Sequence, residues 1–281
     1  TSALAPLCTS LATIGVVLAA RGDIRALAMS MVLGSLLEWV VVQWQLRHAG
    51  VSLWPGRMFG SGELRRLAKG SAVLLGGTFI MSFSPMIEQG LGSGLGKGTV
   101  AALGYANKLP TVLNTILMGA VGVTVLPFFS EMLTRRDHAR CRRAFRLYAL
   151  TLLVGGGLLV LSLVALSEPL VALAYQRGAF HADDTRLVAE IQRAYLIQLP
   201  GTLVGILAMR LLVAQSAYRV VAIINSISVV TAGMFAWTLS RQFGAMGIAL
   251  GLSLAATSSG LIWFLVALRT FSLNHRIEEQ G

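Results

Sequence analysis

The chain has 281 residues, of which 55% are hydrophobic and only 12% are charged, and its mean hydropathy is +0.73. A soluble domain carries roughly 25% charged residues, so this balance excludes a pair of ordinary soluble domains of the same total length. The net charge of +11 comes from Lys and Arg residues that lie between apolar blocks, which favours a membrane topology over a nucleic-acid partner.

Apolar blocks follow one another along the chain, each close to the ~20 residues that a helix needs to cross a bilayer. Lipid offers no hydrogen-bond partner to backbone groups, and the alternating pattern of a membrane barrel is absent, so each block is predicted to be a helix. The predicted fold class is all-α, a polytopic integral membrane protein with about eight transmembrane helices. The predicted spans are residues 2–20, 26–46, 71–91, 100–129, 145–166, 188–213, 220–239 and 245–268.

The beginning of the chain carries no secretory signal. Position 1 is Thr and no basic segment precedes the first apolar run, so we expect that an N-terminal part of the protein precedes Thr1. Cys8 lies in the first span and Cys141 in a basic loop, at different depths, so neither a disulfide framework nor a cysteine metal site is expected.

Lys and Arg residues fall mainly in alternate connections, at a ratio of about two to one. The positive-inside rule places the richer connections, at 47–69, 135–146, 219 and 269–276, in the cytoplasm. The longest of them, residues 50–70, contains Pro55, several glycines and a basic amphipathic turn, and it is predicted to be a linker with a short helix on the membrane surface. We expect residues 1–49 and residues 71–281 to be separate helical parts.

Ionisable side chains inside a span are costly, and Glu38, Glu88, Lys108 and Arg210 are therefore functional candidates. Glu88 follows Pro85 in a span whose helix is expected to be broken, as at transporter sites, although it could also reach outside water or pair with Lys108. Lys108 could line a cavity or extend its ammonium group to the outer surface. The same choice is open for Glu38.

Arg210 lies towards the predicted cytoplasmic end of its span, where its side chain either reaches water or meets an anionic substrate. Uncharged polar residues such as Asn225, Thr231, Thr257 and Ser258 favour hydrogen bonds between helices, with cation coordination as the alternative.

Motifs for covalent chemistry are not met in the sequence. Residues 92–99, GSGLGKGT, lack the Ser or Thr that a phosphate loop needs after its Lys. The four histidines show no metal-ligand spacing, and Asp183 and Asp184 are typical of helix N-terminal caps. We therefore expect a protein that is not an enzyme, with no metal and no cofactor.

Segments 93–109 (SGLGKGTVAALGYANKL), 123–132 (VTVLPFFSEM) and 175–185 (YQRGAFHADDT) occur in this order along the chain. Together they resemble the MviN/MurJ family of lipid-linked sugar flippases, within the multidrug/oligosaccharidyl-lipid/polysaccharide exporter superfamily. The resemblance implies that the spans correspond to helices five to twelve of a two-lobe exporter fold. Residues 1–49 would then be the last two helices of the N-terminal lobe and residues 71–281 the six-helix C-terminal lobe.

The resemblance also implies site residues. Lys108 occupies the place of a cavity arginine, and the substrate-binding candidates are Lys108, Asn107, Asn114 and Arg210. Glu88 falls near a position that some relatives use for a coordinating cation, with Asn225 as its partner in ion coupling. The outer-loop motif of the family is matched by Arg177, Gly178, Ala179 and Phe180. Lys108 keeps the charge of an arginine but loses its bidentate recognition of phosphate.

The activity that the resemblance implies is the flipping of a polyprenyl-pyrophosphate glycolipid, such as lipid II, across a bacterial cytoplasmic membrane by alternating access. Coupling to Na⁺, to H⁺ or to the membrane potential, and partners among cell-wall synthesis proteins, belong to the same expectation. A small-molecule or drug antiporter of the superfamily is the nearest alternative. A scaffold that transports nothing is an alternative of another class.

Overall fold

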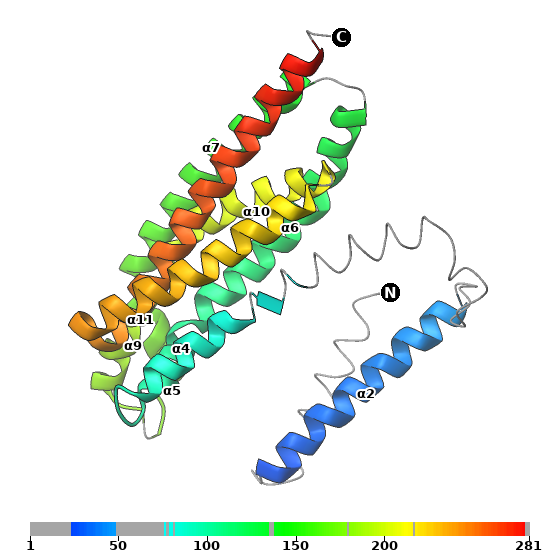
Figure 1. Cartoon of the computed structure of the whole chain (residues 1–281). Helices are drawn as coiled ribbons and strands as arrows, with labels where there is room; N and C mark the ends of the chain where they lie inside the picture. Colours follow the sequence, from blue (N-terminus) through cyan, green and yellow to red (C-terminus); the bar gives the residue numbers. More distant parts are fainter. Residues whose placement is uncertain are drawn as a thin grey trace. The chain divides into compact units, whose positions relative to one another are not determined.

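The structure, a computed structural model, describes residues 24–48, 76, 79–80, 82–134, 138–178, 180–215 and 217–278. Within these residues the regular structure is entirely helical, which confirms the predicted all-α fold. The chain divides into two compact units, Thr1–Leu67 and Ala68–Gly281. The first contains α2 (Ile24–His48) (Figure 1), which matches the predicted span 26–46. Glu38 is an exposed residue of this helix. The predicted span 2–20 and the linker 50–70 lie outside the described residues.

The second unit contains the other described helices, and its C-terminal half runs through long helices that lie side by side (Figure 1). Two predicted spans are each divided into two helices: 100–129 is shared by α5 and α6, and 188–213 by α9 and α10. The helices are α4 (Phe83–Ser93), α5 (Thr99–Ala106), α6 (Lys108–Thr134), α7 (His138–Ala165), α8 (Ser167–Tyr175), α9 (Ala182–Leu196), α10 (Gln198–Ala214) and α11 (Tyr218–Glu278).

Proline marks where several of these helices begin. Pro85, Pro110, Pro169 and Pro200 are each the third residue of their helix, in α4, α6, α8 and α10. Proline has no N–H group to donate to the preceding turn, but in the first turn of a helix that N–H would have no partner within the helix. Before α6, α8 and α10 one helix ends and the next starts close to its proline, so the chain can take a new direction there. Pro85 has the same place in α4, near the predicted break.

Gly244 divides α11 into two arms. Its φ of 58° and ψ of −133° are outside the helical region, and they favour glycine because a Cβ would be strained there. Gly247 of the second arm lies against the backbone of Leu239, and Gly251 against that of Ala236. The arms therefore form an antiparallel hairpin packed through glycine, in agreement with the predicted spans 220–239 and 245–268.

The second arm of α11 also packs closely on α10. A side chain at Gly201 would bring its Cβ to 2.7 Å from the Thr257 Cα, and Gly260 lies directly against the backbone of Gly201. Leu203, Leu207 and Leu211, on the same helix, are almost fully buried. This backbone-to-backbone contact fixes α10 and α11 relative to each other.

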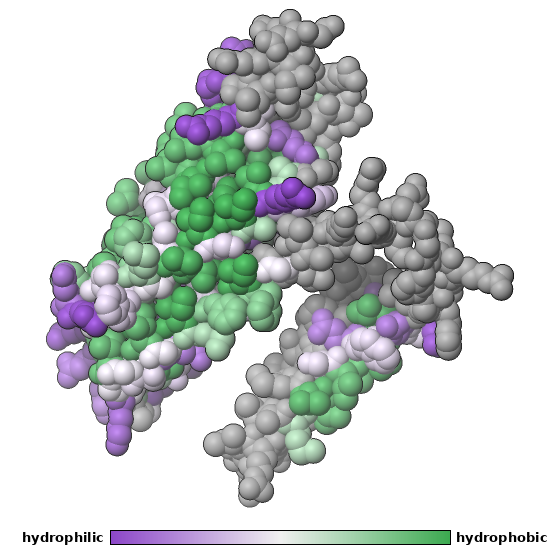
Figure 2. Space-filling view, in the orientation of Figure 1, coloured by the Kyte–Doolittle hydropathy of each residue, from purple (hydrophilic) through white to green (hydrophobic). Residues whose placement is uncertain are grey.

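Large apolar side chains also cover the outside of the second unit. On α7, Leu147, Leu150, Leu158 and Leu161 are all exposed, and Figure 2 shows a broad hydrophobic region with hydrophilic groups gathered towards its ends. An exposed apolar surface of this kind is suited to lipid. Three helical segments among the described residues are long and apolar enough to cross a membrane: Arg140–Ala165, Ala182–Ala214 and Tyr218–Thr270.

Candidate functional site: a cavity lined by broken helices

A cavity of about 750 Å³ lies among the helices of the second unit. Its wall comes from α4, α6, α9, α10 and both arms of α11, together with Asn107 between α5 and α6. Five of the predicted site residues line it: Glu88, Asn107, Asn114, Arg210 and Asn225. Lys108 is exposed and is not part of this wall.

Glu88 is the centre of a hydrogen-bond cluster at one end of the cavity. The Tyr195 hydroxyl donates to Glu88 Oε1 over 2.8 Å, and Asn107 Nδ2 donates to Oε2 over 3.4 Å. Thr111 Oγ1 extends the cluster by donating to Asn107 Oδ1 over 3.3 Å. Tyr195 is only 1% exposed, so its hydroxyl depends on Glu88 for its acceptor. Both carboxylate oxygens therefore have partners within the protein.

The helix breaks explain why these groups meet. Asn107 is the residue between α5 and α6, Tyr195 is the penultimate residue of α9, and Glu88 lies one turn after Pro85. A helix that breaks inside the membrane leaves backbone groups and polar side chains that need hydrogen-bond partners within the bundle. Three proline breaks therefore converge on one carboxylate, which is the kind of place where transporters carry ion and substrate sites.

The middle of the cavity contains neutral hydrogen bonds between helices. Thr202 Oγ1 on α10 donates to Asn114 Oδ1 on α6 over 3.1 Å. The hydroxyls of Ser228 and Ser259 are hydrogen-bonded across the two arms of α11. The first contact joins α6 to α10 and the second joins the two arms of α11, and neither involves a charged group.

Arg210 occupies the other end of the cavity. Its Nε is buried and has no hydrogen-bond partner, and the guanidinium forms no ion pair with an acidic side chain of the described residues. Asn225, on the first arm of α11, also lines the cavity, and within the described part of the chain no hydrogen bond satisfies its side chain.

Contacts between helices show how far apart Glu88 and Asn225 lie along the axis of α11. The Ile87 side chain packs against Gly233, so Glu88 lies near that level of α11. Asn225 is eight residues from Gly233, or about 12 Å along a helix that rises 1.5 Å per residue. No hydrogen bond joins Glu88 to Asn225 among the described residues, and their pairing in ion coupling stays a prediction.

The contacts of Glu88 and Lys108 bear on whether the two side chains pair with each other, reach water or line the cavity. No ion pair between Glu88 and Lys108 occurs among the described residues, and Glu88 is bound by Tyr195 and Asn107. Lys108 begins α6 with an exposed side chain, one residue from Asn107. A substrate role for Lys108 stays a prediction.

The outer-loop motif forms the connection between α8 and α9. Arg177 donates to the Leu173 carbonyl over 3.3 Å and so covers the end of α8, and Gly178 has a positive φ of 61° that favours glycine. The ring of Phe180 lies 5.9 Å from that of Tyr105 on α5 and 6.1 Å from that of Tyr175. The motif thus anchors its loop on α5 through aromatic contacts. Ala179 lies outside the described residues.

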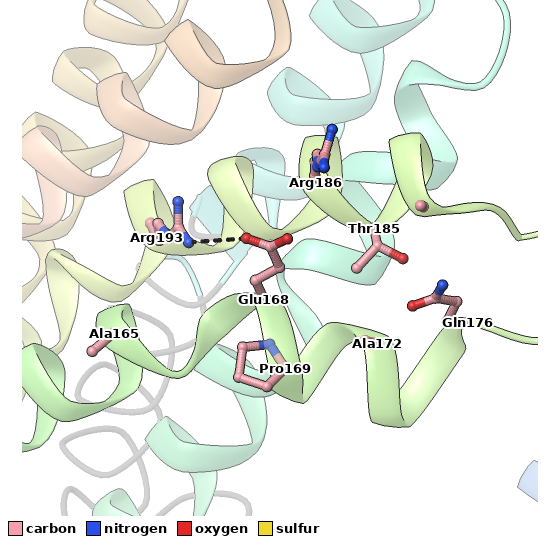
Figure 3. A pocket seen from close by; sticks show the side chains of 9 residues that line it. Ala165, Glu168, Pro169, Ala172, Gln176, Thr185, Arg186 and Arg193 are labelled. Carbon is pink, nitrogen blue, oxygen red and sulfur yellow. Dashed lines mark ion pairs between the residues drawn. The ribbon is translucent and has the colours of Figure 1, made fainter.

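A smaller pocket of about 420 Å³ lies beside this loop, between α8 and α9. Figure 3 shows Arg193 on α9 pointing towards Glu168 on α8, and their N–O distance is 3.8 Å. Asp184 accepts a hydrogen bond from the His181 backbone N–H over 2.9 Å, which completes a capping box at the start of α9. This confirms the predicted capping role for Asp184. No cluster of His, Cys, Asp or Glu that could hold a metal occurs in the ranges that the structure describes.

Sequence reasoning missed Tyr195, Thr202 and the Ser228–Ser259 pair. Tyr195 is separated from Glu88 by 107 positions along the chain, so no local pattern links them. One available signal was Pro200, because a proline inside a predicted span indicates a break and a polar side chain just before it can face inward.

The arrangement of the second unit, a bundle of long apolar helices around a cavity bordered by helix breaks, is that of a polytopic membrane transporter. Solved structures with the same fold include the lipid II flippase MurJ in an inward closed conformation, with a TM-score of 0.71 and 19% identity over 98% of this chain and 59% of that one. They also include a Vibrio cholerae MATE transporter, with a TM-score of 0.68 and 16% identity over 94% and 60%.

Sequence comparison narrows this class. A family model described as lipid II flippase MurJ matches residues 1–277, and the chain belongs to this family. A probable lipid II flippase MurJ of Bdellovibrio bacteriovorus is 22% identical over 244 residues, which are 87% of this chain and 46% of the relative. One of Rhizobium tropici is 29% identical over 181 residues, 62% of this chain and 33% of the relative. The chain thus spans less than half the length of these curated relatives.

Proposed function

We propose that this chain is part of a flippase that moves a polyprenyl-pyrophosphate glycolipid, of which lipid II is the first candidate, across a bacterial cytoplasmic membrane. The observation that carries the proposal is the family match over residues 1–277. The cavity in the second unit supports it, because the cavity places polar and charged groups inside a bundle whose surface is apolar. A multiply charged head group cannot cross hydrocarbon unaided, and such a cavity offsets its loss of hydration.

Alternating access is the proposed mechanism. The head group would enter a polar cavity open to one side of the membrane while the polyprenyl tail stays in lipid, and movement of helices would open the cavity to the other side. The proline breaks before α6 and α10 supply points at which helix direction can change without the loss of a regular helical turn. Lys108, one residue from the break at Asn107, is the proposed cation for the head group.

Glu88 is the proposed coupling residue. Binding of Na⁺ or H⁺ to its carboxylate would compete with the hydrogen bonds from Tyr195 and Asn107, and so would loosen the contact between α4, the α5–α6 break and α9. Alternatively, the membrane potential would act on the charge, which is worth about 2.3 kcal/mol per charge per 100 mV. Cell-wall synthesis proteins are the proposed partners.

The decisive experiment uses the full-length protein in proteoliposomes. Lipid II is placed in one leaflet, its accessibility in the other is measured, and the wild type is compared with Lys108→Ala. A matched control is Lys97→Ala, because Lys97 is also an exposed lysine, in the turn before α5. We expect wild-type translocation that Lys108→Ala reduces and Lys97→Ala preserves. Absence of wild-type translocation under imposed ion gradients and potential would overturn the proposal.

A drug antiporter is the second candidate function, because a MATE transporter in complex with MaL6 matches the fold as well as MurJ does, with a TM-score of 0.71 at 15% identity. The same proteoliposomes distinguish the two functions. Uptake of an organic cation driven by an ion gradient, without lipid translocation, would favour the antiporter.

A further inference from the structure

Arg210 lines the cavity as a cation that the described protein does not satisfy. A guanidinium has five N–H donors, and a buried donor without an acceptor is destabilising. Arg210 Nε is nevertheless buried without a partner, and no carboxylate of the described residues pairs with the side chain. Leu207 and Leu211 on the same helix are fully buried, so the guanidinium lies beside a well-packed apolar core.

Asn225 adds a second polar group at this end. Ser228 is hydrogen-bonded to Ser259 across the α11 hairpin, so Asn225 lies opposite the level of Ile262 and Trp263. A Cβ at Gly205 would lie 3.6 Å from Trp263, which places Asn225 near the level of Gly205 on α10. Arg210 is five residues further along α10, so the two side chains differ in depth by about 7 Å. At that separation, one ligand with two polar groups can contact both Arg210 and Asn225.

The charge of the cavity favours an anion at this end. Glu88 is the one acidic side chain in the described cavity wall, and it lies near the level of Tyr195, fifteen residues before Arg210. At 1.5 Å per residue along the helix this is about 20 Å away, so the Glu88 carboxylate is too distant to form an ion pair with Arg210. Asn114, Thr202, Ser228 and Ser259 lie between them and are neutral.

We propose that Arg210 and Asn225 form an anion subsite that binds a phosphate or pyrophosphate group inside the cavity, separate from Lys108. The Arg210 guanidinium donates paired N–H groups to phosphate oxygens, and the Asn225 amide donates to an oxygen further along the group. The inference rests on the proposed function, which it deepens by adding, between α10 and the first arm of α11, a second binding position for the charged part of the head group besides Lys108. It also assigns a purpose to a buried N–H that otherwise has none.

The test measures equilibrium binding to the purified full-length protein in detergent. The probes are undecaprenyl pyrophosphate, undecaprenol and inorganic pyrophosphate. We expect Arg210→Gln to weaken undecaprenyl pyrophosphate binding about tenfold and Asn225→Ala to weaken it about threefold, and Arg210→Lys to retain part of the affinity. Undecaprenol binding should be unchanged in all variants, because it lacks the anion. Inorganic pyrophosphate binding with the same dependence would identify the subsite as one for free phosphates as well as for head groups.

The control is Arg219→Gln, which removes the same charge from an exposed residue in the first turn of α11 outside the cavity wall. Equal loss of binding in Arg219→Gln and Arg210→Gln would overturn the subsite, as would unchanged binding in Arg210→Gln. Thermal stability of each variant shows that it is folded, and Arg210→Lys keeps the test valid where Arg210→Gln does not fold. Translocation by the same wild-type sample separates the two proposals, since a working flippase with Arg210-independent binding refutes the subsite alone.

Discussion

The charged side chains at the two ends of the cavity differ in their hydrogen bonding. At one end, both oxygens of the Glu88 carboxylate accept hydrogen bonds, from Tyr195 and Asn107. At the other, the buried Arg210 Nε has no acceptor among the residues that the structure describes. A charge with protein partners holds helices in place, whereas a charge without them is available to a ligand. Under the proposals above, Glu88 stabilises this conformation and Arg210 binds an incoming anion.

The largest effect on stability is expected where α10 and the second arm of α11 pack together between the two ends of the cavity, at Gly260. Gly260→Ala places a Cβ against the Gly201 backbone, and we expect a loss of about 3 kcal/mol of stability because two helix backbones must separate. Gly155→Ala is the control, since nothing lies within 4 Å of a Cβ there. Thermal unfolding in detergent checks both, and equal midpoints would show that this contact does not fix the bundle.

The Glu88 end is tested by removing the acceptor. Glu88→Ala leaves the buried Tyr195 hydroxyl without a partner, and we expect a loss of about 2 kcal/mol of stability. Glu88→Gln keeps a carbonyl acceptor and should retain most of the stability. Glu168→Ala, in a half-exposed ion pair with Arg193, should cost under about 1 kcal/mol. Denaturation midpoints of the three variants show which of them loses the most stability. If Glu88→Ala is as stable as the wild type, the cluster does not hold the helices.

Glu88→Gln also tests the coupling proposal. A glutamine side chain accepts a hydrogen bond but carries no charge, so ion-gradient-dependent transport by the full-length protein should fall at least tenfold while folding is preserved. The rate of transport with and without the gradient is the measurement. Unchanged coupled transport would refute a coupling role for Glu88.

The Arg210 end should behave differently in the absence of ligand. Arg210→Met removes a buried donor without a partner and keeps an apolar stem, so we expect stability to stay constant or to rise by up to about 1 kcal/mol. Thermal unfolding without added lipid is the measurement. A loss above about 1 kcal/mol would mean that Arg210 has a structural role, and the contrast between the two ends would fail.

The smallest effect on stability is expected in the middle of the cavity, between Glu88 and Arg210. Thr202→Val removes the hydrogen bond to Asn114, and such bonds between membrane helices contribute about 0.6 kcal/mol. Thr238→Val is the control, because Thr238 bonds only to carbonyls of its own helix. Unfolding midpoints compare the two, and a Thr202→Val loss as large as that of Glu88→Ala would show that neutral contacts stabilise the cavity as much as the carboxylate does.

The long elements of this fold could be predicted because apolar block length and proline position are local signals. The spans 26–46, 145–166, 220–239 and 245–268 match helices or helix arms, and Glu88, Asn107, Asn114, Arg210 and Asn225 were recognised as polar residues within apolar spans. Hydropathy alone does not show where a span is broken, so the divisions at Asn107 and Ile197 were missed. Which polar groups meet depends on helix packing, and for this reason the partners of Glu88 did not follow from the sequence.

The hairpin at Gly244 has a consequence for how the protein is made. Gly247 and Gly251 of the second arm lie against the backbone of Leu239 and Ala236 of the first, so each arm covers backbone of the other that would otherwise face lipid. The first arm leaves the ribosome with its contact face uncovered, and it gains its partner only when the second arm has been synthesised. Packing of the hairpin is therefore complete only after both arms have been synthesised, and a chain truncated between them would lack the contacts of Gly247 and Gly251 with the first arm.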